Sequence, residues 1–130
     1  LRRRRAREEQ APSVSTVLSE ADVDGLRDAP EGVQVDDDLL EYVARVARQT
    51  RDDRRVAAGV SPRGTQRVFE AARARATIVG RDYVTPEDIQ RISQPVMAHR
   101  LVLTADAAVE GVSKRDIVDD SVSAFTVPTV

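Results

Sequence analysis

Apolar residues recur at helical spacing in four separate stretches of the chain, residues 36–52, 61–79, 85–96 and 113–125. In each stretch they return every three or four positions, which is typical of a helix with one face against a core. The positions expected to face the core are Leu39, Val43, Val46 and Thr50, with Leu40, Ala44 and Ala47 beside them; Thr65, Phe69, Ala72, Ala76 and Val79; Ile89, Ile92 and Val96; and Ile117, Val118, Val122 and Phe125. The pattern predicts a mainly all-α fold, a small helical bundle.

Local signals mark where helices begin and end. Ser19 and Asp22 have the spacing of a capping box and predict a further short helix that runs to about Asp28. The run Thr85-Pro86-Glu87-Asp88 combines a cap, a first-turn proline and two first-turn acids, which is the strongest helix start in the chain. Gly80 is placed to end the preceding helix in the left-handed conformation.

Two short segments have the character of strands. Tyr83 and Val84 predict a brief extended segment, and the apolar run within residues 100–103 has strand length. We therefore expect at most a minor two-stranded β element, formed by residues 83–84 and 100–103. Pro95 is expected to kink or restart the helix that contains it, because it lacks the N–H of the helical ladder and crowds the preceding turn.

The chain length suits one domain with a short extension at each end. We expect residues 1–15 to be a linker or the end of an upstream helix, residues 16–126 to be the helical domain, and residues 127–130 to be a loose tail. The chain starts at Leu1 and continues directly into Arg2–Arg5, as though it began inside a longer helix. We interpret it as a fragment of a larger protein.

Composition excludes several classes of function. The 130 residues contain no cysteine, which excludes a disulfide scaffold and a cysteine-ligated metal site. A net charge of -2 argues against a dedicated nucleic-acid binder, since neutralising phosphates usually needs a basic surface. No run of about 18 apolar residues exists, so a membrane-spanning helix is excluded and we expect a soluble, cytoplasmic protein.

No complete catalytic apparatus is recognisable in the chain. The single histidine, His99, has no nucleophile in a recognisable arrangement and is expected to be structural. Lys114 is the only lysine, and no phosphate-binding loop of the Gly-x-x-x-x-Gly-Lys type surrounds it. Asp36–Asp38 are better explained as helix capping than as a metal site, because consecutive helical positions point in different directions. The chain alone is therefore not expected to be an enzyme, and no metal site is expected.

Arg63 is the one residue whose placement suggests a ligand. It follows the cap Ser61 and the first-turn Pro62, where the helix dipole disfavours a positive charge by about 0.3 to 1 kcal/mol. An external anion would remove this conflict, because a guanidinium group and a helix N-terminus are both typical of phosphate sites. The alternative is a solvated side chain, since first-turn arginines are common.

Four segments of the sequence form a recognisable set: Val35–Leu40, Gly59–Gly64 with the arginine- and alanine-rich helix Phe69–Ala76, Gly80–Ile89, and Ala98–Leu101. Together they resemble the C-terminal lid domain of the MoxR-type AAA+ ATPases. The resemblance spans about residues 13 to 128, and the segments keep the family's order and spacing. Gly64 stands where the family often has alanine, a difference expected to weaken the first helical turn by at most about 1 kcal/mol.

The resemblance implies a role in nucleotide sensing. It makes Arg63 the sensor-2 arginine, which reaches the γ-phosphate of ATP held with Mg²⁺ by an N-terminal large domain, with Ser61, Pro62 and Arg67 as supporting residues. It also implies that the parent protein hydrolyses ATP, forms a ring with neighbouring subunits and remodels protein clients as a chaperone does.

Two other interpretations remain open at the level of sequence. A helix-turn-helix module would direct Arg63, Arg67, Arg73 and Arg75 toward DNA, although the net charge and the lack of the short connecting turn oppose it. A pure protein-interaction domain would give Arg63 no role.

Overall fold

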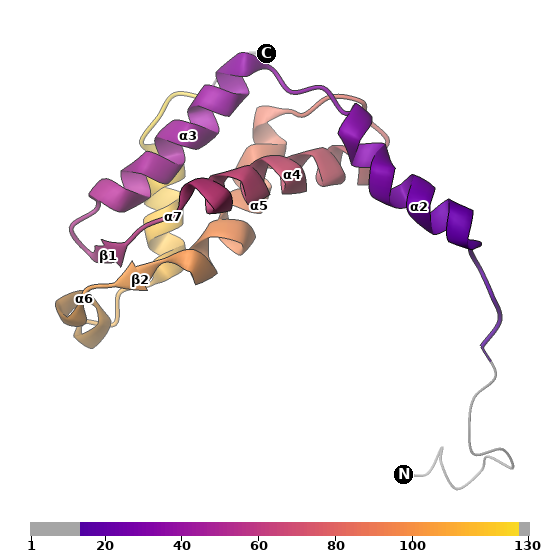
Figure 1. Cartoon of the computed structure of the whole chain (residues 1–130). Helices are drawn as coiled ribbons and strands as arrows, with labels where there is room; N and C mark the ends of the chain where they lie inside the picture. The colour runs from indigo at the N-terminus through magenta and orange to yellow at the C-terminus, as the bar shows by residue number, and fades with distance from the viewer. Residues whose placement is uncertain (1–13, 128–130) are drawn as a thin grey trace, which may run out of the picture.

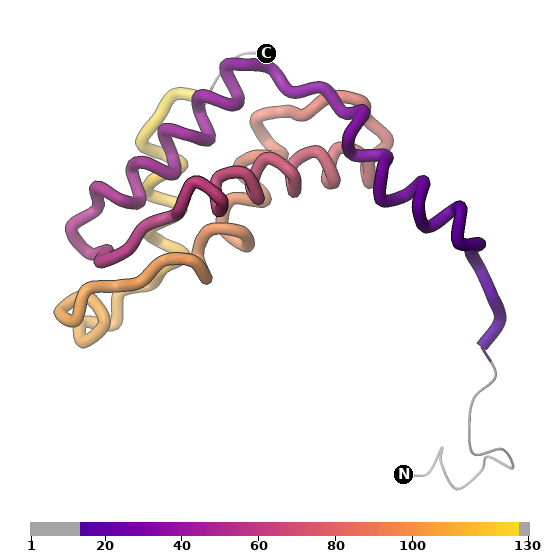
Figure 2. Tube along the Cα trace, in the orientation of Figure 1, coloured from indigo at the N-terminus to yellow at the C-terminus, as the bar shows by residue number. Residues whose placement is uncertain are grey.

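Helices α3, α4, α5 and α7 form the body of the protein, and α2 projects from it (Figure 1; the same path is traced in Figure 2). The computed structural model describes residues 14–127. In chain order the elements are α2 (Glu20–Asp28), the short 3-10 helix η1 (Ala29–Gly32), α3 (Asp37–Asp52), β1 (Val56–Ala58), α4 (Pro62–Ile78), α5 (Pro86–Met97), the 3-10 helix η2 (Ala98–Arg100), β2 (Val102–Leu103), α6 (Ala105–Val109) and α7 (Lys114–Ser123). The mainly all-α fold is confirmed.

One hydrophobic core joins the four large helices. Leu39 and Val46 of α3, Ile89 of α5, and Ile117 and Val118 of α7 are essentially fully buried, as the sequence predicted. Partly buried side chains that pack against this core include Ile92, Val96, Val122 and Phe125. The apolar stripes therefore identify the core face of α3, α5 and α7 correctly.

The core face of α4 was predicted only in part. Ala72 and Ala76 are fully buried as predicted, and the other buried residues are Gly64 and Val68. Of the remaining predicted positions, Phe69 is only half-buried and Val79 is 48% exposed. Apolar residues occupy more than one side of α4, so periodicity alone cannot select the side that meets α5. The row of small residues decides it, because small side chains let two helix backbones approach closely.

The predicted helix starts are confirmed by their hydrogen bonds. Ser19 with Asp22 and Thr85 with Asp88 both form complete capping boxes. Asp36 caps α3 by accepting a hydrogen bond from the backbone N–H of Asp38, at 2.8 Å, which supports the capping interpretation of the acidic triplet. Each cap satisfies a donor that the helix leaves unpaired.

The end of α4 is a Schellman motif built on Gly80. Gly80 has a φ of 75°, and its N–H donates to the carbonyl of Thr77. The next N–H, of Arg81, donates to the carbonyl of Ala76 at 2.9 Å, which completes the motif. This turn reverses the chain and places Arg81 against the start of α5.

The predicted pairing of the β element was wrong. The strand within residues 100–103 exists, but it pairs antiparallel with β1, in a segment expected to be a loop. Tyr83 instead forms an isolated parallel bridge with Gln34. The sequence could not select the partner, because two- and three-residue strands carry no register signal and long-range packing brings β1 and β2 together.

Pro95 does not divide its helix. The helix α5 continues through Pro95 as one element and ends at Met97. Pro95 and Arg91 are both exposed, so solvent can hydrate the Arg91 carbonyl that loses its partner. The helix α6, capped by Thr104, was not predicted from the sequence.

The sequence expectations about the chain ends lie largely outside the described residues. The upstream segment of residues 1–13 and the tail at 128–130 are not described. Within residues 14–127, no helix has the length and apolar character needed to cross a bilayer.

Candidate functional site

The start of α4 is fixed by the residue that precedes its cap. Val60 is fully buried, its N–H donates to the Thr50 hydroxyl at 3.0 Å, and its carbonyl accepts from the guanidinium of Arg51 at 2.7 Å. Gly59 lies directly against the backbone of Arg51, where a Cβ would come within 2.7 Å. The end of α3 therefore determines where Arg63 emerges.

The first turn of α4 has one unpaired backbone donor. The Ser61 hydroxyl accepts from Gly64 N–H at 3.1 Å, the Ser61 carbonyl accepts from Thr65 N–H at 2.9 Å, and Pro62 has no N–H. Only the N–H of Arg63 remains free. The helix N-terminus alone is thus a weak anion site, and positive charge at this end must come from side chains.

Three arginines supply that charge. Arg63, Arg67 and Arg100 line one hollow of about 300 Å³, together with Gly59, Ser61 and Gly64. Arg67 also pairs with Glu70, one turn further along α4. Among the described residues Arg63 forms no ion pair, so its exposed guanidinium can interact with an anion that enters the hollow.

Arg100 is held in the hollow by the end of α5. Its guanidinium donates through one nitrogen to the carbonyl of Val96 and contacts Nε2 of His99. His99 Nδ1 lies 3.0 Å from the Pro95 carbonyl, which can only accept, so Nδ1 is the protonated nitrogen and Nε2 accepts from Arg100. His99 therefore has the structural role expected of it, as a positioning partner of Arg100.

Gly64 permits the close approach of Arg100. A Cβ at Gly64 would come within 2.8 Å of Val60 Cγ1 and 3.2 Å of Arg100 Cδ. The expectation from sequence treated this glycine only as a weak helix former. In the structure, the Arg100 side chain passes over α4 at Gly64, where the lack of a Cβ leaves room for it.

We expect Gly64→Ala to lower the free energy of unfolding by about 1 kcal/mol, because the clash with buried Val60 outweighs the gain in helix propensity. Thermal unfolding followed by circular dichroism measures the change. Gly25→Ala in α2 is the matched control, since no atom lies within 4 Å of its added Cβ. Equal midpoints for the two variants would show that Val60 yields without cost.

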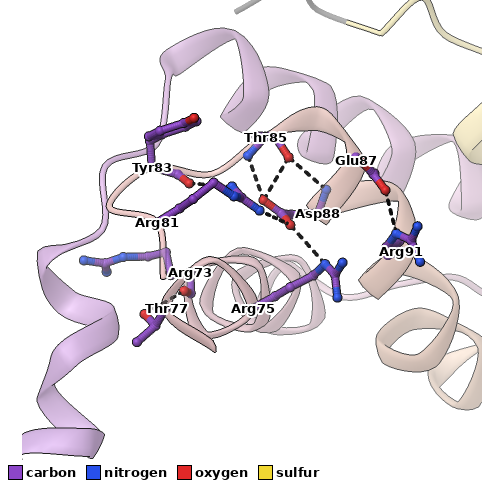
Figure 3. A network of polar contacts seen from close by, with 9 residues as sticks. All are labelled: Arg73, Arg75, Thr77, Arg81, Tyr83, Thr85, Glu87, Asp88 and Arg91. Atoms are coloured by element: carbon purple, nitrogen blue, oxygen red, sulfur yellow. Dashed lines mark hydrogen bonds and ion pairs between the residues drawn. The ribbon is translucent and has the colours of Figure 1, made fainter. Parts of the chain in front are cut away.

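A buried carboxylate fixes α4 relative to α5, as Figure 3 shows. Asp88 is 1% exposed and accepts from Arg81 at 2.8 Å and from the Thr85 N–H at 2.9 Å. Arg75 Nε lies 3.0 Å from the same carboxylate without hydrogen-bond geometry, so this contact is an ionic attraction. We call Asp88, Arg75 and Arg81 the Asp88 clasp.

The Asp88 clasp keeps its carboxylate charged. Burial would raise the pKa of Asp88, but the hydrogen bonds from Arg81 and Thr85 outweigh burial and bring the pKa down to about 2. The same pairing raises the pKa of Arg81. The clasp therefore joins three charges across α4 and α5 at neutral pH.

The four arginines that a helix-turn-helix module would direct toward DNA have different surroundings in the structure. Arg73 donates to the Val33 carbonyl and pairs with Glu31, while Arg75 belongs to the Asp88 clasp. Only Arg63 and Arg67 of the four face the hollow. Pro62, predicted as a supporting residue, lines a different groove between α3 and α4. The continuous arginine face that DNA binding would need is absent from the described residues.

The sequence pattern of the AAA lid domain matches residues 48–121, which is more than half of the chain. The chain belongs to the AAA lid domain family. Its relatives include the chaperone MoxR1 and proteins named MoxR, in agreement with the resemblance to MoxR-type lids found in the sequence.

Relatives of this lid are longer proteins. The uncharacterized protein YeaC of Bacillus subtilis is 35% identical over 116 residues, which are 89% of the lid chain and 36% of YeaC. The chaperone MoxR1 of Mycobacterium tuberculosis is 33% identical over 128 residues, which are 92% of the lid chain and 34% of MoxR1. The chain thus spans about a third of the length of these relatives.

A solved structure has the same fold. The lid is similar to part of a crystal structure of an assigned ATPase from Cytophaga hutchinsonii, with a TM-score of 0.87 and 26% sequence identity. The match covers 98% of the lid chain and 41% of that protein. The order and packing of the lid elements are therefore shared with part of that longer protein.

Arg100 is the residue of the hollow that sequence reasoning missed. Arg100 belongs to the segment Ala98–Leu101 of the resemblance, but the resemblance gave it no role. Its signal in the sequence is weak, because Arg100 follows α5 and reaches the start of α4 only through the tertiary fold.

Proposed function

We propose that this lid closes over ATP bound by a large domain of its parent protein, and that Arg63 is the sensor-2 arginine. The observation that carries the proposal is the hollow at the start of α4, where Arg63 is exposed and unpaired among the described residues. Membership of the AAA lid domain family supports this assignment. Ser61 and Arg67 are supporting residues, and we add Arg100.

The hollow suits a phosphate and not a metal ion. Its lining holds three guanidinium groups and no carboxylate. No group of acidic or histidine side chains suited to a metal ion exists among residues 14–127. Within the proposal, Mg²⁺ is therefore bound by the large domain together with ATP, and the lid contributes positive charge only.

The proposed mechanism of Arg63 is electrostatic. A guanidinium group beside the γ-phosphate stabilises negative charge that increases on its oxygens during phosphoryl transfer. When the γ-phosphate is lost, Arg63 loses its partner, and the lid returns to the angle that its remaining contacts prefer. The Asp88 clasp and the Val60 contacts make the helices move as one unit, so a local change at Arg63 can become a rotation of the lid.

The parent protein is proposed to be an ATPase of the MoxR type. Its partners would be the N-terminal large domain, neighbouring subunits of a ring and protein clients that it remodels in the manner of a chaperone. The name of the relative MoxR1, a chaperone, supports this part of the proposal.

The test compares the affinities of two nucleotides in the parent protein. Arg63→Ala should weaken ATP binding by about tenfold, equivalent to about 1.4 kcal/mol, and should change ADP affinity by less than about twofold, because ADP lacks the γ-phosphate. Titration calorimetry with a non-hydrolysable ATP analogue and with ADP measures both.

The matched control is Arg91→Ala, which removes an exposed arginine paired with Glu87 on α5. It should leave both affinities unchanged. An equal loss of ATP and ADP affinity in Arg63→Ala would contradict γ-phosphate sensing, and no loss of either would leave Arg63 without a nucleotide role.

A further inference from the structure

Helix α2 exposes an apolar side that none of residues 14–127 covers. Its nine residues include none that is buried, and Val23 and Leu26 are 36% and 60% exposed. Leu18, one position before the Ser19 cap, is 49% exposed and is placed to pack against Val23. A helix shorter than about 12 residues is marginal in water by itself, so α2 requires a partner surface for stability.

A second apolar surface of the protein lies between α3 and α4. An open groove of about 360 Å³ runs between α3 and α4 and has an apolar lining of Leu40, Val43, Ala44, Pro62 and Phe69. Leu40 is 40% exposed, and Phe69 is the side chain that the sequence wrongly assigned to the core. The groove lies on the side of α4 opposite the hollow of Arg63, so this inference is independent of the proposed function.

The charges of the two surfaces are complementary. Helix α2 carries four acids and one arginine, and the acids are Glu20, Asp22, Asp24 and Asp28. The described residues that line the groove include Arg48 and Arg51 and no carboxylate. An acidic helix with an apolar side fits an apolar groove with basic residues, a common mode of helix recognition.

The lengths also agree. Helix α2, with nine residues, is about 13 Å long at 1.5 Å per residue. The groove follows α3 from Leu40 to Arg51 and α4 from Pro62 to Phe69, spans of about 16 and 10 Å.

In the structure, α2 lies outside the groove of its own chain. The connection after α2 is held by Arg73 of α4, which contacts Glu31 and the Val33 carbonyl. The next residue of the connection, Gln34, forms backbone hydrogen bonds with Asp82 and Val84. From this anchor α2 leaves the body of the protein (Figure 1), so the groove is open to a helix of another molecule.

We propose that α2 of one copy of this chain docks, by Val23 and Leu26, into the α3–α4 groove of a second copy. The contact is heterologous, because one copy contributes the helix and the other contributes the groove. Repetition of such a contact builds a closed ring or an open array, and two copies can also exchange helices reciprocally.

Cross-linking between copies tests the pairing directly, because the chain has no cysteine of its own. One copy carries Arg27→Cys, beside the apolar side of α2, and the other carries Gln66→Cys, in the lining of the groove. A short bis-maleimide should join this pair at least about tenfold faster than a pair of Arg27→Cys and Val109→Cys, since docking raises the effective concentration. Val109 is the matched control because it is 89% exposed and lies on α6, away from the groove.

Two further variants separate docking from chance collisions. Leu26→Asp in the copy with Arg27→Cys should abolish the tenfold preference without unfolding the core, because α2 has no buried residue. Arg48→Glu should weaken self-association about tenfold in sedimentation equilibrium, and mixing it with an Asp24→Lys copy should recover part of the loss. A chain that is monomeric at millimolar concentration, or a preference that survives Leu26→Asp, would overturn the proposal and assign both surfaces to other partners.

Discussion

Arg63→Ala is expected to lower the kcat of ATP hydrolysis by the parent protein about 100-fold, equivalent to about 2.7 kcal/mol of transition-state stabilisation. The physical reason is that charge on the γ-phosphate oxygens increases in the transition state, and a guanidinium group preorganised beside them stabilises that charge. Steady-state phosphate release at saturating ATP measures the effect. At saturating ATP, the measured rate reports kcat and does not depend on the smaller loss of ATP affinity.

Two comparison variants make this result interpretable. Arg63→Lys keeps the positive charge but loses the planar fork, so it should recover only part of the rate. Arg91→Ala, an exposed arginine remote from the hollow, should keep the full rate. Hydrolysis by Arg63→Ala at the rate of the unchanged protein would eliminate Arg63 as the sensor.

Asp88→Asn is expected to lower the free energy of unfolding of the lid by about 3 kcal/mol. The substitution removes the acceptor shared by Arg75 and Arg81, whose side chains are 34% and 25% exposed and can rehydrate only in part. For a domain of this size the loss corresponds to a fall of about 10–20 °C in the thermal midpoint. Differential scanning calorimetry measures it.

The control for Asp88→Asn is Asp22→Asn, because both aspartates occupy the same position of a capping box. Asp22 is exposed, and its helix contributes nothing to the core, so the midpoint should hardly change. Similar midpoints for the two variants would mean that burial of Asp88 has no energetic consequence.

Lowering the pH should reduce the free energy of unfolding of the unchanged lid for the same reason as Asp88→Asn does. Because the pKa of Asp88 in the folded lid is about 2, below the ordinary value of 3.8, its stabilisation is present above about pH 4 and is lost as pH falls toward 2. The slope of stability against pH over this range should be smaller in Asp88→Asn. An identical slope in both proteins would show that other carboxylates cause the acid unfolding.

Local physical chemistry in the sequence was sufficient for most helix boundaries. Capping boxes at Ser19 and Thr85 and the left-handed Gly80 act within a few residues, so the chain specifies them before any tertiary contact forms. The same locality explains why Arg63 could be selected: a positive charge in the first turn after Ser61-Pro62 is anomalous within its own helix. The resemblance to MoxR-type lids then supplied a role for it.

Tertiary packing decided the core face of α4, the partner of strand β2 and the position of Arg100. Sequence alone determined a helical lid with an arginine at the start of α4, because caps, glycine stops and apolar period are local properties. Only packing determined that Val68 faces the core in place of Phe69, that β2 pairs with β1, and that Arg100 joins Arg63. These contacts link residues distant in the chain, and their free energy depends on shape and burial that no single segment encodes.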